Sequence, residues 1–392
     1  MKLDHGLHLA YCTNIHRGET WAQMFDALQQ FGLAVRERVC PNAPYGIGLR
    51  LSNQAARQLS SGSILAGFQK WLDANQCYVF TINGFPYGQF HGTRVKEQVY
   101  APDWTTRERL IYTNLLFDLL AKLLPNGIEG SVSTVPGSFK SFLKTPEQER
   151  ALRENLWRCV EHVARVSDQT GKPLHLGLEP EPLCYLETSE ETARFFDRLR
   201  ADHPHDPKLE THLGVNYDAC HLAVEFEEPH EALRRFREHG VRISKIHLSS
   251  ALKVRPTPEA RQALRAFADD VYFHQVIARS ADGALTRYRD LGDALDPHPP
   301  VPLPQSEEWR IHFHIPLHCE PSAGFASTAD HLLGLLDALR EEPGLCPHLE
   351  METYTWEVMP PELKHRGVVD QLVAEYDWTL RRLAERGLAT WK

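Results

Sequence analysis

The sequence lacks long apolar runs and any excess of positive charge. Across its 392 residues, no segment approaches the roughly 20 consecutive apolar residues of a membrane-spanning helix. The first residues, MKLDHGLHLAYC, have no extended apolar stretch of the signal-peptide type, and these absences together favour a cytoplasmic protein. The formal net charge of -9 provides no general electrostatic surface for nucleic acid or an anionic membrane, so neither is an expected partner.

Paired cysteines are also missing. The eight cysteines contain no CxxC pair, which argues against a zinc ribbon or a thioredoxin-like redox site. In a chain of this length we expect several of them to be buried apolar thiols. Histidine is abundant instead, with 21 residues, many of them in strand-like segments.

Strand-like segments alternate with amphipathic helical segments along the chain. Eight such strands predict an α/β fold with a parallel sheet, and their number suggests a closed (β/α)8 TIM barrel, with a doubly wound open sheet as the competing arrangement. Capping-box patterns predict helix starts at Thr105 with Glu108 and at Thr145 with Gln148. The predicted strands are 7–12, 47–52, 78–83, 128–134, 174–179, 213–218, 243–249 and 349–355.

The two faces of the predicted strands differ in polarity, and this favours the barrel. One set of alternate positions is small or polar, as at Thr81, Asn83, Asn216 and Asp218, whereas the other is mostly aliphatic or aromatic. An open sheet covered by helices on both faces would be apolar on both sides of each strand. A polar lining with an apolar outer face fits a barrel whose interior carries the chemistry.

A long excursion, at about 250–318, separates the predicted seventh and eighth strands. Within it, Asp282 and Gly283 between alternating segments predict a β-hairpin, and the Pro-rich DPHPPVPLP predicts a surface connection. Because the barrel needs strands from both ends of the chain, we expect residues 1–392 to form a single domain.

Polar residues stand at the C-terminal ends of the last four strands, where TIM barrels carry their active sites. Carboxylates and imidazoles that meet at one mouth suit a divalent metal, with Mn, Zn, Fe, Co or Mg as candidates, because burying them together without a cation or a water network is costly. Glu350 and Glu352 share a strand face, and Glu352 is nearer the strand end. The candidate ligands are Glu179, Asp218, His221, His247 and Glu352.

Each candidate also has a purely structural interpretation. Asp218 could cap a following helix that has His221 in its first turn, and His247 could be a hydrogen-bonded core histidine. Glu179 could pair with a lysine, and Lys245 could neutralise one of the carboxylates. The joint order over successive strands, Glu, Asp-x-x-His, His, Glu, is more specific than any one of these residues.

This order resembles that of the xylose isomerase-like TIM barrels, a superfamily that holds sugar (phosphate) isomerases and epimerases and also endonuclease IV. The resemblance implies one to three divalent metal ions, with Glu179, Asp218, His247 and Glu352 as ligands. It also implies that Glu179 and Glu352 act as the catalytic acid and base.

Four longer segments resemble a narrower family within that superfamily, the Ebo-type metabolite traffic protein EboE. The segments are LAYCTNIHRGETW, NGFPYGQFHGTRVKEQVYAPDW, LGLEPEPLCYLET and METYTWEVMP. That family is encoded with genes that process and move a small metabolite, so the resemblance implies a role there without specifying the reaction.

Two further groups could serve a second metal or the substrate. His312 and His314 share one side of an extended segment, and could bind a second metal or reach a substrate hydroxyl. At the corresponding place after strand seven, endonuclease IV has the pattern Asp-x-His. This chain has His312 where that pattern has Asp, which argues against a strict endonuclease IV site. Glu187 matches a second glutamate of the epimerase pattern, or simply precedes a helix cap at Thr188.

Four other residues are candidates for substrate contacts. Arg50 could bind an anionic or hydroxyl-rich ligand, or form a salt bridge to an inward glutamate. Asn83 and His91 belong to a Gly- and aromatic-rich segment that could form a substrate wall or only a turn. Trp356 could stack on a sugar or cyclitol ring, or fill the core.

Three functions follow from these features. The first is a metal-dependent isomerase or epimerase for a sugar, sugar phosphate or cyclitol-like metabolite. The second is an endonuclease IV-like phosphodiesterase, which the histidines support and the net acidity opposes. The third is a non-catalytic metabolite-binding barrel, against which the carboxylates at both acid–base positions argue mildly.

Overall fold

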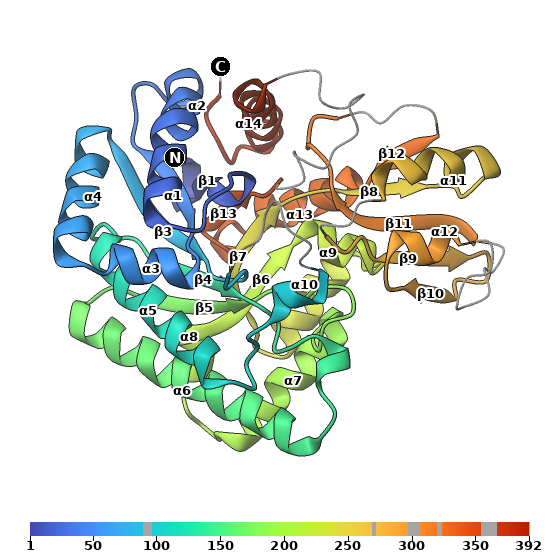
Figure 1. Cartoon of the computed structure of the whole chain (residues 1–392), viewed down its shortest axis with the longest axis horizontal. Coiled ribbons are helices and arrows are strands. Elements are labelled where there is room, and N and C mark those ends of the chain that lie inside the picture. Colours follow the sequence, from blue (N-terminus) through green and yellow to red (C-terminus); the bar gives the residue numbers. More distant parts are fainter. Residues whose placement is uncertain (89–95, 269–271, 297–305, 320–323, 354–366, 392) are drawn as a thin grey trace.

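Eight parallel strands close into a barrel with helices around its outside (Figure 1). The computed structural model describes residues 1–88, 96–268, 272–296, 306–319, 324–353 and 367–391. The strands follow one another around the barrel in the order β1-β13-β7-β6-β5-β4-β3-β2, which confirms the predicted TIM barrel and excludes the open sheet. The barrel strands are β1 (His8–Cys12), β2 (Tyr45–Arg50), β3 (Cys77–Asn83), β4 (Gly130–Thr134), β5 (Leu174–Leu178), β6 (Leu213–Asp218), β7 (Arg242–Leu248) and β13 (His348–Met351).

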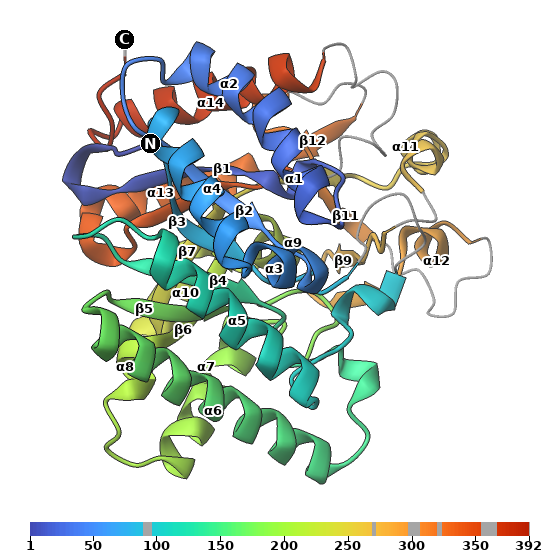
Figure 2. The ribbon, with the colours of Figure 1, turned by 60° about the vertical axis from the view of Figure 1, so that its left-hand side comes forward.

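The helices between these strands cover the outer face, and Figure 2 shows α3, α4, α5 and α6 along one flank. None of the helices in the described ranges is long and apolar enough to cross a membrane. They are α1 (Trp21–Ala27), α2 (Leu33–Val39), α3 (Asn53–Leu59), α4 (Gly62–Ala74), α5 (Arg107–Leu123), α6 (Pro146–Thr170), α7 (Ser189–Asp202), α8 (Lys208–His212), α9 (Ala219–Val224), α10 (Pro229–Glu238), α11 (Pro258–Leu264), α12 (Leu291–Leu295), α13 (Ala329–Glu341) and α14 (Val368–Ala384).

The two predicted capping boxes have different outcomes. Thr145 and Gln148 form a complete box at the start of α6, as predicted. The box predicted at Thr105 is wrong, because the backbone N–H and hydroxyl of Thr105 both donate to the side chain of Asp103. Thr106 is the N-cap of α5 instead, and its side chain makes no capping bond.

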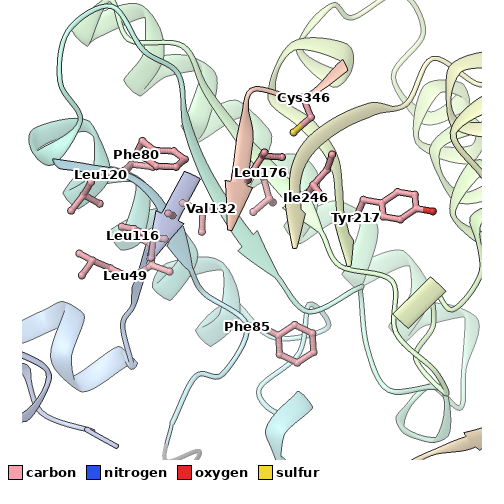
Figure 3. Packing of buried hydrophobic residues seen from close by; sticks show 14 of the residues in the cluster. Leu49, Phe80, Phe85, Leu116, Leu120, Val132, Leu176, Tyr217, Ile246 and Cys346 are labelled. Carbon is pink, nitrogen blue, oxygen red and sulfur yellow. The ribbon is translucent and has the colours of Figure 1, made fainter. Parts of the chain in front are cut away.

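The space between the strands and the outer helices holds the main hydrophobic core (Figure 3). Leu49, Val132 and Leu176 of the strands and Leu116 and Leu120 of α5 are completely buried there. Burial of each such side chain contributes roughly 1.5–3 kcal/mol. The apolar set of alternate strand positions therefore holds the helices against the barrel and leaves its interior to polar groups.

The deepest level of the barrel interior is aromatic and imidazole-rich. Phe80 lies between His8 and His348, with ring centroids 5.3 and 4.9 Å away, and His348 stacks on His175 at 5.3 Å. A strict alternation would turn Phe80 outward, but a register shift in the β2–β3 pairing brings its ring beneath Gly46. Several of the sequence's histidines therefore close the bottom of the barrel.

A five-stranded antiparallel sheet is inserted between β7 and β13 and lies to one side of the barrel in Figures 1 and 2. Its strand order is β10-β9-β11-β8-β12, and Trp309 and Phe313 belong to its own hydrophobic core. Asp282 and Gly283 lie in the turn of the predicted hairpin, with a φ of +86° at Gly283. The strands are β8 (Ala251–Val254), β9 (Val276–Ser280), β10 (Leu285–Tyr288), β11 (Ser306–His314) and β12 (Phe325–Ser327).

Arginines of the inserted sheet bind it to the barrel. Arg287 of β10 forms ion pairs with Glu187 and Glu225, at 3.0 and 2.5 Å. Arg310 of β11 donates to the backbone oxygen of Ala223 at 2.6 Å. These contacts hold β11 against α9, so the end of β11 reaches the mouth of the barrel.

The buried carboxyl of Glu375, in α14, ties together two chain segments that flank the mouth. Its Oε1 accepts hydrogen bonds from the hydroxyl of Thr353 at 2.7 Å and from the backbone N–H of Leu317 at 3.0 Å. Burial raises the pKa of Glu375 from 4.5 to about 7. The folded protein therefore binds this proton more tightly than the unfolded chain does, and the resulting stabilisation is lost as the pH rises from about 4.5 through 7.

We expect Glu375→Gln to reduce this pH dependence. Between pH 5 and pH 8, the wild type should lose on the order of 2–3 kcal/mol of unfolding free energy relative to the variant, because Gln keeps an acceptor oxygen but carries no charge. Urea unfolding of both proteins at the two pH values measures the difference. Glu341→Gln, at the exposed end of α13, is the control. Parallel pH profiles for wild type and Glu375→Gln would contradict the expectation.

Candidate metal centre

Four carboxylate and imidazole side chains meet at the C-terminal mouth of the barrel. Glu179 follows β5, Asp218 ends β6, His247 lies in β7 and Glu352 follows β13. One potential ligand atom from each lies within 4.8 Å of the others. Nδ1 of His247 lies 3.2 Å from Glu179, 3.3 Å from Asp218 and 2.9 Å from Glu352. The structure thus brings together the four residues that the resemblance to xylose isomerase-like barrels implies as ligands.

This group concentrates negative charge in a buried place. Burial raises the pKa of Glu352 to about 7, and the carboxylates of Glu179 and Asp218 add to this effect. Burial lowers the pKa of His247, but the carboxylates around it, Glu352 first, outweigh burial and hold it well above its usual value. Oε2 of Glu179 and Oδ2 of Asp218 are buried and make no hydrogen bond of normal geometry with described residues. Such oxygens around an imidazole nitrogen fit a divalent cation.

Glu350 lies deeper in the barrel and supports His247. Its Oε2 accepts a hydrogen bond from Nζ of Lys245 at 2.7 Å and lies 3.1 Å from Nε2 of His247. Nε2–H of His247 therefore donates to Glu350, which leaves Nδ1 to face the other carboxylates, an arrangement common among metal-binding histidines. Glu352, and not Glu350, belongs to the four-residue group.

Three histidines form a second group beside the first. His221 comes from α9, and His312 and His314 come from β11 of the inserted sheet. Their ring centroids are 4.6 to 5.4 Å apart. Asp218, which also belongs to the first group, has a carboxylate oxygen within 4.8 Å of ligand atoms of His221 and His314. The two groups therefore have Asp218 in common.

Backbone carbonyl groups fix the orientation of two of these imidazoles. Nδ1 of His221 lies 3.0 Å from the oxygen of Pro180, and Nδ1 of His314 lies 3.0 Å from the oxygen of Glu352. Because a carbonyl oxygen can only accept, both rings carry a proton on Nδ1. Their Nε2 atoms are 3.4 Å apart, a distance at which two lone pairs require a shared proton or a metal ion between them.

Glu181, two residues after Glu179, is an additional candidate ligand. Its Oε1 accepts a hydrogen bond from the hydroxyl of Tyr100 at 2.8 Å, and it forms a further potential metal group with His221 and His312. Burial raises its pKa to about 7. The only signal in the sequence was its place in the repeat Glu-Pro-Glu-Pro that starts at Glu179.

A small cavity of about 50 Å³, partly open to solvent, adjoins both groups. Asn14 and Asn83 line it and donate to Oε1 of Glu352 at 2.5 and 3.2 Å. Its other polar lining residues include Glu179, Glu181, Glu352, His221 and His312, and its aromatic lining residues are Phe85, Tyr100, Tyr272 and Phe273. A lining that combines polar and aromatic side chains suits a small ligand with hydroxyl groups and a ring or carbon face.

Two residues predicted to contact substrate lie elsewhere. The guanidinium of Arg50 donates to the backbone oxygen of Gly18 at 2.6 Å, and Arg50 is not among the lining residues of the cavity. Glu187 is buried in ion pairs with Lys140 and Arg287, so it joins the barrel to the inserted sheet. Sequence spacing could not show these partners, which are distant in the chain. The predicted contacts His91 and Trp356 lie outside the described residues.

Among solved structures, the fold is similar to TIM barrels of the xylose isomerase-like kind. A xylose isomerase-like TIM barrel protein from Mycobacterium smegmatis, in complex with magnesium, has a TM-score of 0.51 and 14% identity, and the match covers 98% of this chain and 99% of that one. A D-tagatose 3-epimerase-like protein has a TM-score of 0.50 and 10% identity, with 97% and 98% covered. The sequence matches no protein-family model and no curated protein, so the resemblance to the Ebo-type family gains no support there. The chain has the xylose isomerase-like TIM-barrel fold.

We expect Gly48→Ala to disturb the support beneath the metal centre. A Cβ at Gly48 would lie 1.8 Å from Oε1 of Glu350, whose carboxylate is held by Lys245 and His247. Such overpacking should lower the unfolding free energy by about 1–3 kcal/mol and weaken metal retention. Gly67→Ala in α4, where nothing lies within 4 Å, is the matched control and should stabilise the helix slightly. Urea unfolding would refute this account if Gly48→Ala matched the wild type.

Proposed function

We propose that the protein is a metal-dependent isomerase or epimerase of a small polyhydroxy metabolite, such as a sugar, a sugar phosphate or a cyclitol. The observation that carries the proposal is the group of Glu179, Asp218, His247 and Glu352, whose ligand atoms lie within 4.8 Å of one another beside a cavity. The likeness to a D-tagatose 3-epimerase-like protein supports a sugar-like substrate, and the magnesium of the mycobacterial protein supports a divalent cation. The Ebo-type resemblance suggests processing or traffic of a small metabolite as its setting.

In this proposal Glu179 and Glu352 move a proton at a carbon of the substrate. They reach the cavity from β5 and β13, with β6 and β7 between them, so one can take the proton from one face and the other return it to the opposite face. When bound, the divalent cation supplies Lewis-acid polarisation of the substrate oxygen next to that carbon. Asn14 and Asn83 hold the carboxylate of Glu352 in place.

We expect Glu179→Gln and Glu352→Gln each to abolish proton exchange while preserving the fold. The measurement is loss of C–H signals from a panel of ketoses, aldoses and keto-cyclitols incubated with the protein in D₂O, followed by NMR. Glu129→Gln replaces a carboxylate at the opposite end of the barrel and should retain exchange. Exchange that persists in Glu352→Gln would remove Glu352 from the acid–base pair.

Metal binding is tested directly on protein produced without a His tag or a nickel column. We expect elemental analysis to find one or more Mn, Zn, Fe or Co ions per chain in the wild type, and none in the double variant Asp218→Ala/His247→Ala, because Asp218 belongs to both ligand groups. A folded wild type that holds no metal and takes none up would overturn the catalytic proposal. The barrel would then be a metabolite-binding protein.

The histidine group favours a second candidate, a two-metal phosphodiesterase. A second ion held by two of these histidines, His221 with His314 and Asp218 or His221 with His312 and Glu181, could share the activation of water with the first centre. This candidate predicts hydrolysis of bis(p-nitrophenyl) phosphate, lost in His314→Ala. The isomerase predicts instead that His314→Ala keeps proton exchange and that a fluorescent DNA duplex fails to bind at low salt, in line with the net charge of -9.

A further inference from the structure

The four residues after β5, Glu179 to Pro182, alternate two side chains that line the cavity with two backbone carbonyls that accept hydrogen bonds. Glu179 and Glu181 line the cavity. The oxygens of Pro180 and Pro182 accept hydrogen bonds from His221 and Gln275, at 3.0 and 3.3 Å. A residue that precedes proline is restricted to extended backbone, which applies to Glu179 and Glu181. The chain then turns, and the backbone N–H of Cys184 donates to the oxygen of Glu181 at 3.0 Å.

The oxygen of Pro182 settles which way the buried amide of Gln275 points. Because a carbonyl oxygen only accepts, the amide atom beside it must be the nitrogen of Gln275. The amide oxygen therefore faces the other way, where it lies 2.7 Å from Nδ1 of His312. Nδ1 of His312 must then carry the proton, and Nε2 of His312, buried and without a hydrogen-bond partner among the described residues, presents its lone pair.

The same amide fixes a second branch that ends on Glu181. Nε2 of Gln275 also donates to the hydroxyl oxygen of Tyr100 at 3.1 Å, so the hydroxyl proton of Tyr100 points to Oε1 of Glu181 at 2.8 Å. The two N–H protons of Nε2 of Gln275 and the hydroxyl proton of Tyr100 each have one acceptor: Pro182, Tyr100 and Glu181. Glu181 is thereby held as an acceptor at the cavity wall.

We propose that Gln275 is a positioning residue for the second metal ion. The carbonyl of Pro182 fixes the orientation of the Gln275 amide, and the amide oxygen fixes the proton of His312 on Nδ1. Nε2 of His312 is then the atom that binds the ion. This inference rests on the second ion of the proposed function, for which His312 shares a potential metal group with His221 and Glu181. With it, all three histidines of the group carry their proton on Nδ1 and offer Nε2, through Pro180 for His221, Glu352 for His314 and Gln275 for His312.

The test is titration of the metal-free protein with Co²⁺, followed by its visible absorption spectrum. In the wild type we expect uptake in two phases, the second missing in His312→Ala. Gln275→Met removes the acceptor for Nδ1–H of His312 and should weaken the second phase by about 10–100-fold, while the first phase stays unchanged and reports correct folding. Gln275→Glu keeps an acceptor oxygen and should restore the second phase.

Tyr100→Phe separates the two branches. It removes the hydrogen bond to Glu181 but leaves the contact between Gln275 and His312, so the second Co²⁺ phase should be weakened less than in Gln275→Met, and equal weakening would contradict the role of Gln275. A second phase of wild-type strength in Gln275→Met, or one as weak in Gln275→Glu as in Gln275→Met, would overturn the positioning role alone. Uptake of a single ion by the wild type would also overturn it and leave the isomerase proposal standing. Uptake of none would overturn both.

Discussion

Compensation of buried negative charge is the constraint on which the rest of this structure depends. Glu179, Asp218, Glu350 and Glu352 are all buried at or just below one mouth of the barrel. Removing a carboxylate from water costs several kcal/mol unless a partner offsets it. Nearby cationic groups include Lys245, paired with Glu350, and His247 and His221 when protonated, and a divalent cation would complete the compensation.

The local features of the mouth follow from that requirement. Gly48 has no side chain because Glu350 occupies the space where a Cβ would lie. Lys245 pairs with the carboxylate of Glu350 and keeps it ionised. Glu350 in turn accepts from Nε2–H of His247, so Nδ1 of His247 faces the mouth of the barrel. In the polar interior, Lys245 therefore orients Glu350, and Glu350 orients the metal-facing imidazole of His247. An aliphatic interior would pack as well but could not hold these groups in place.

The sequence predicted the barrel and the four-residue group because both depend on strict strand alternation. A carboxylate or imidazole at the last inward position of a strand must point into the mouth, whatever the rest of the chain does. Two departures from the expected pattern have local causes: a bulge turned Phe80 inward, and Asp103 accepted the hydrogen bonds of Thr105, where a capping box was expected. Gln275 carried no sequence signal, because its importance arises only where β9 meets the loop after β5.

The two ligand groups differ in chemistry, and this difference bears on what the site can do. The first offers three carboxylates and one imidazole, a set that suits Mn²⁺ or Mg²⁺, whereas the second is mainly imidazole and suits Zn²⁺, Co²⁺ or Fe²⁺. The first comes wholly from barrel strand ends, while the second needs β11 of the inserted sheet. Proton transfer between Glu179 and Glu352 requires only the first group. The inserted sheet, held by Arg287 and Arg310, would thus add a second, chemically distinct metal to a barrel that is already complete for isomerisation.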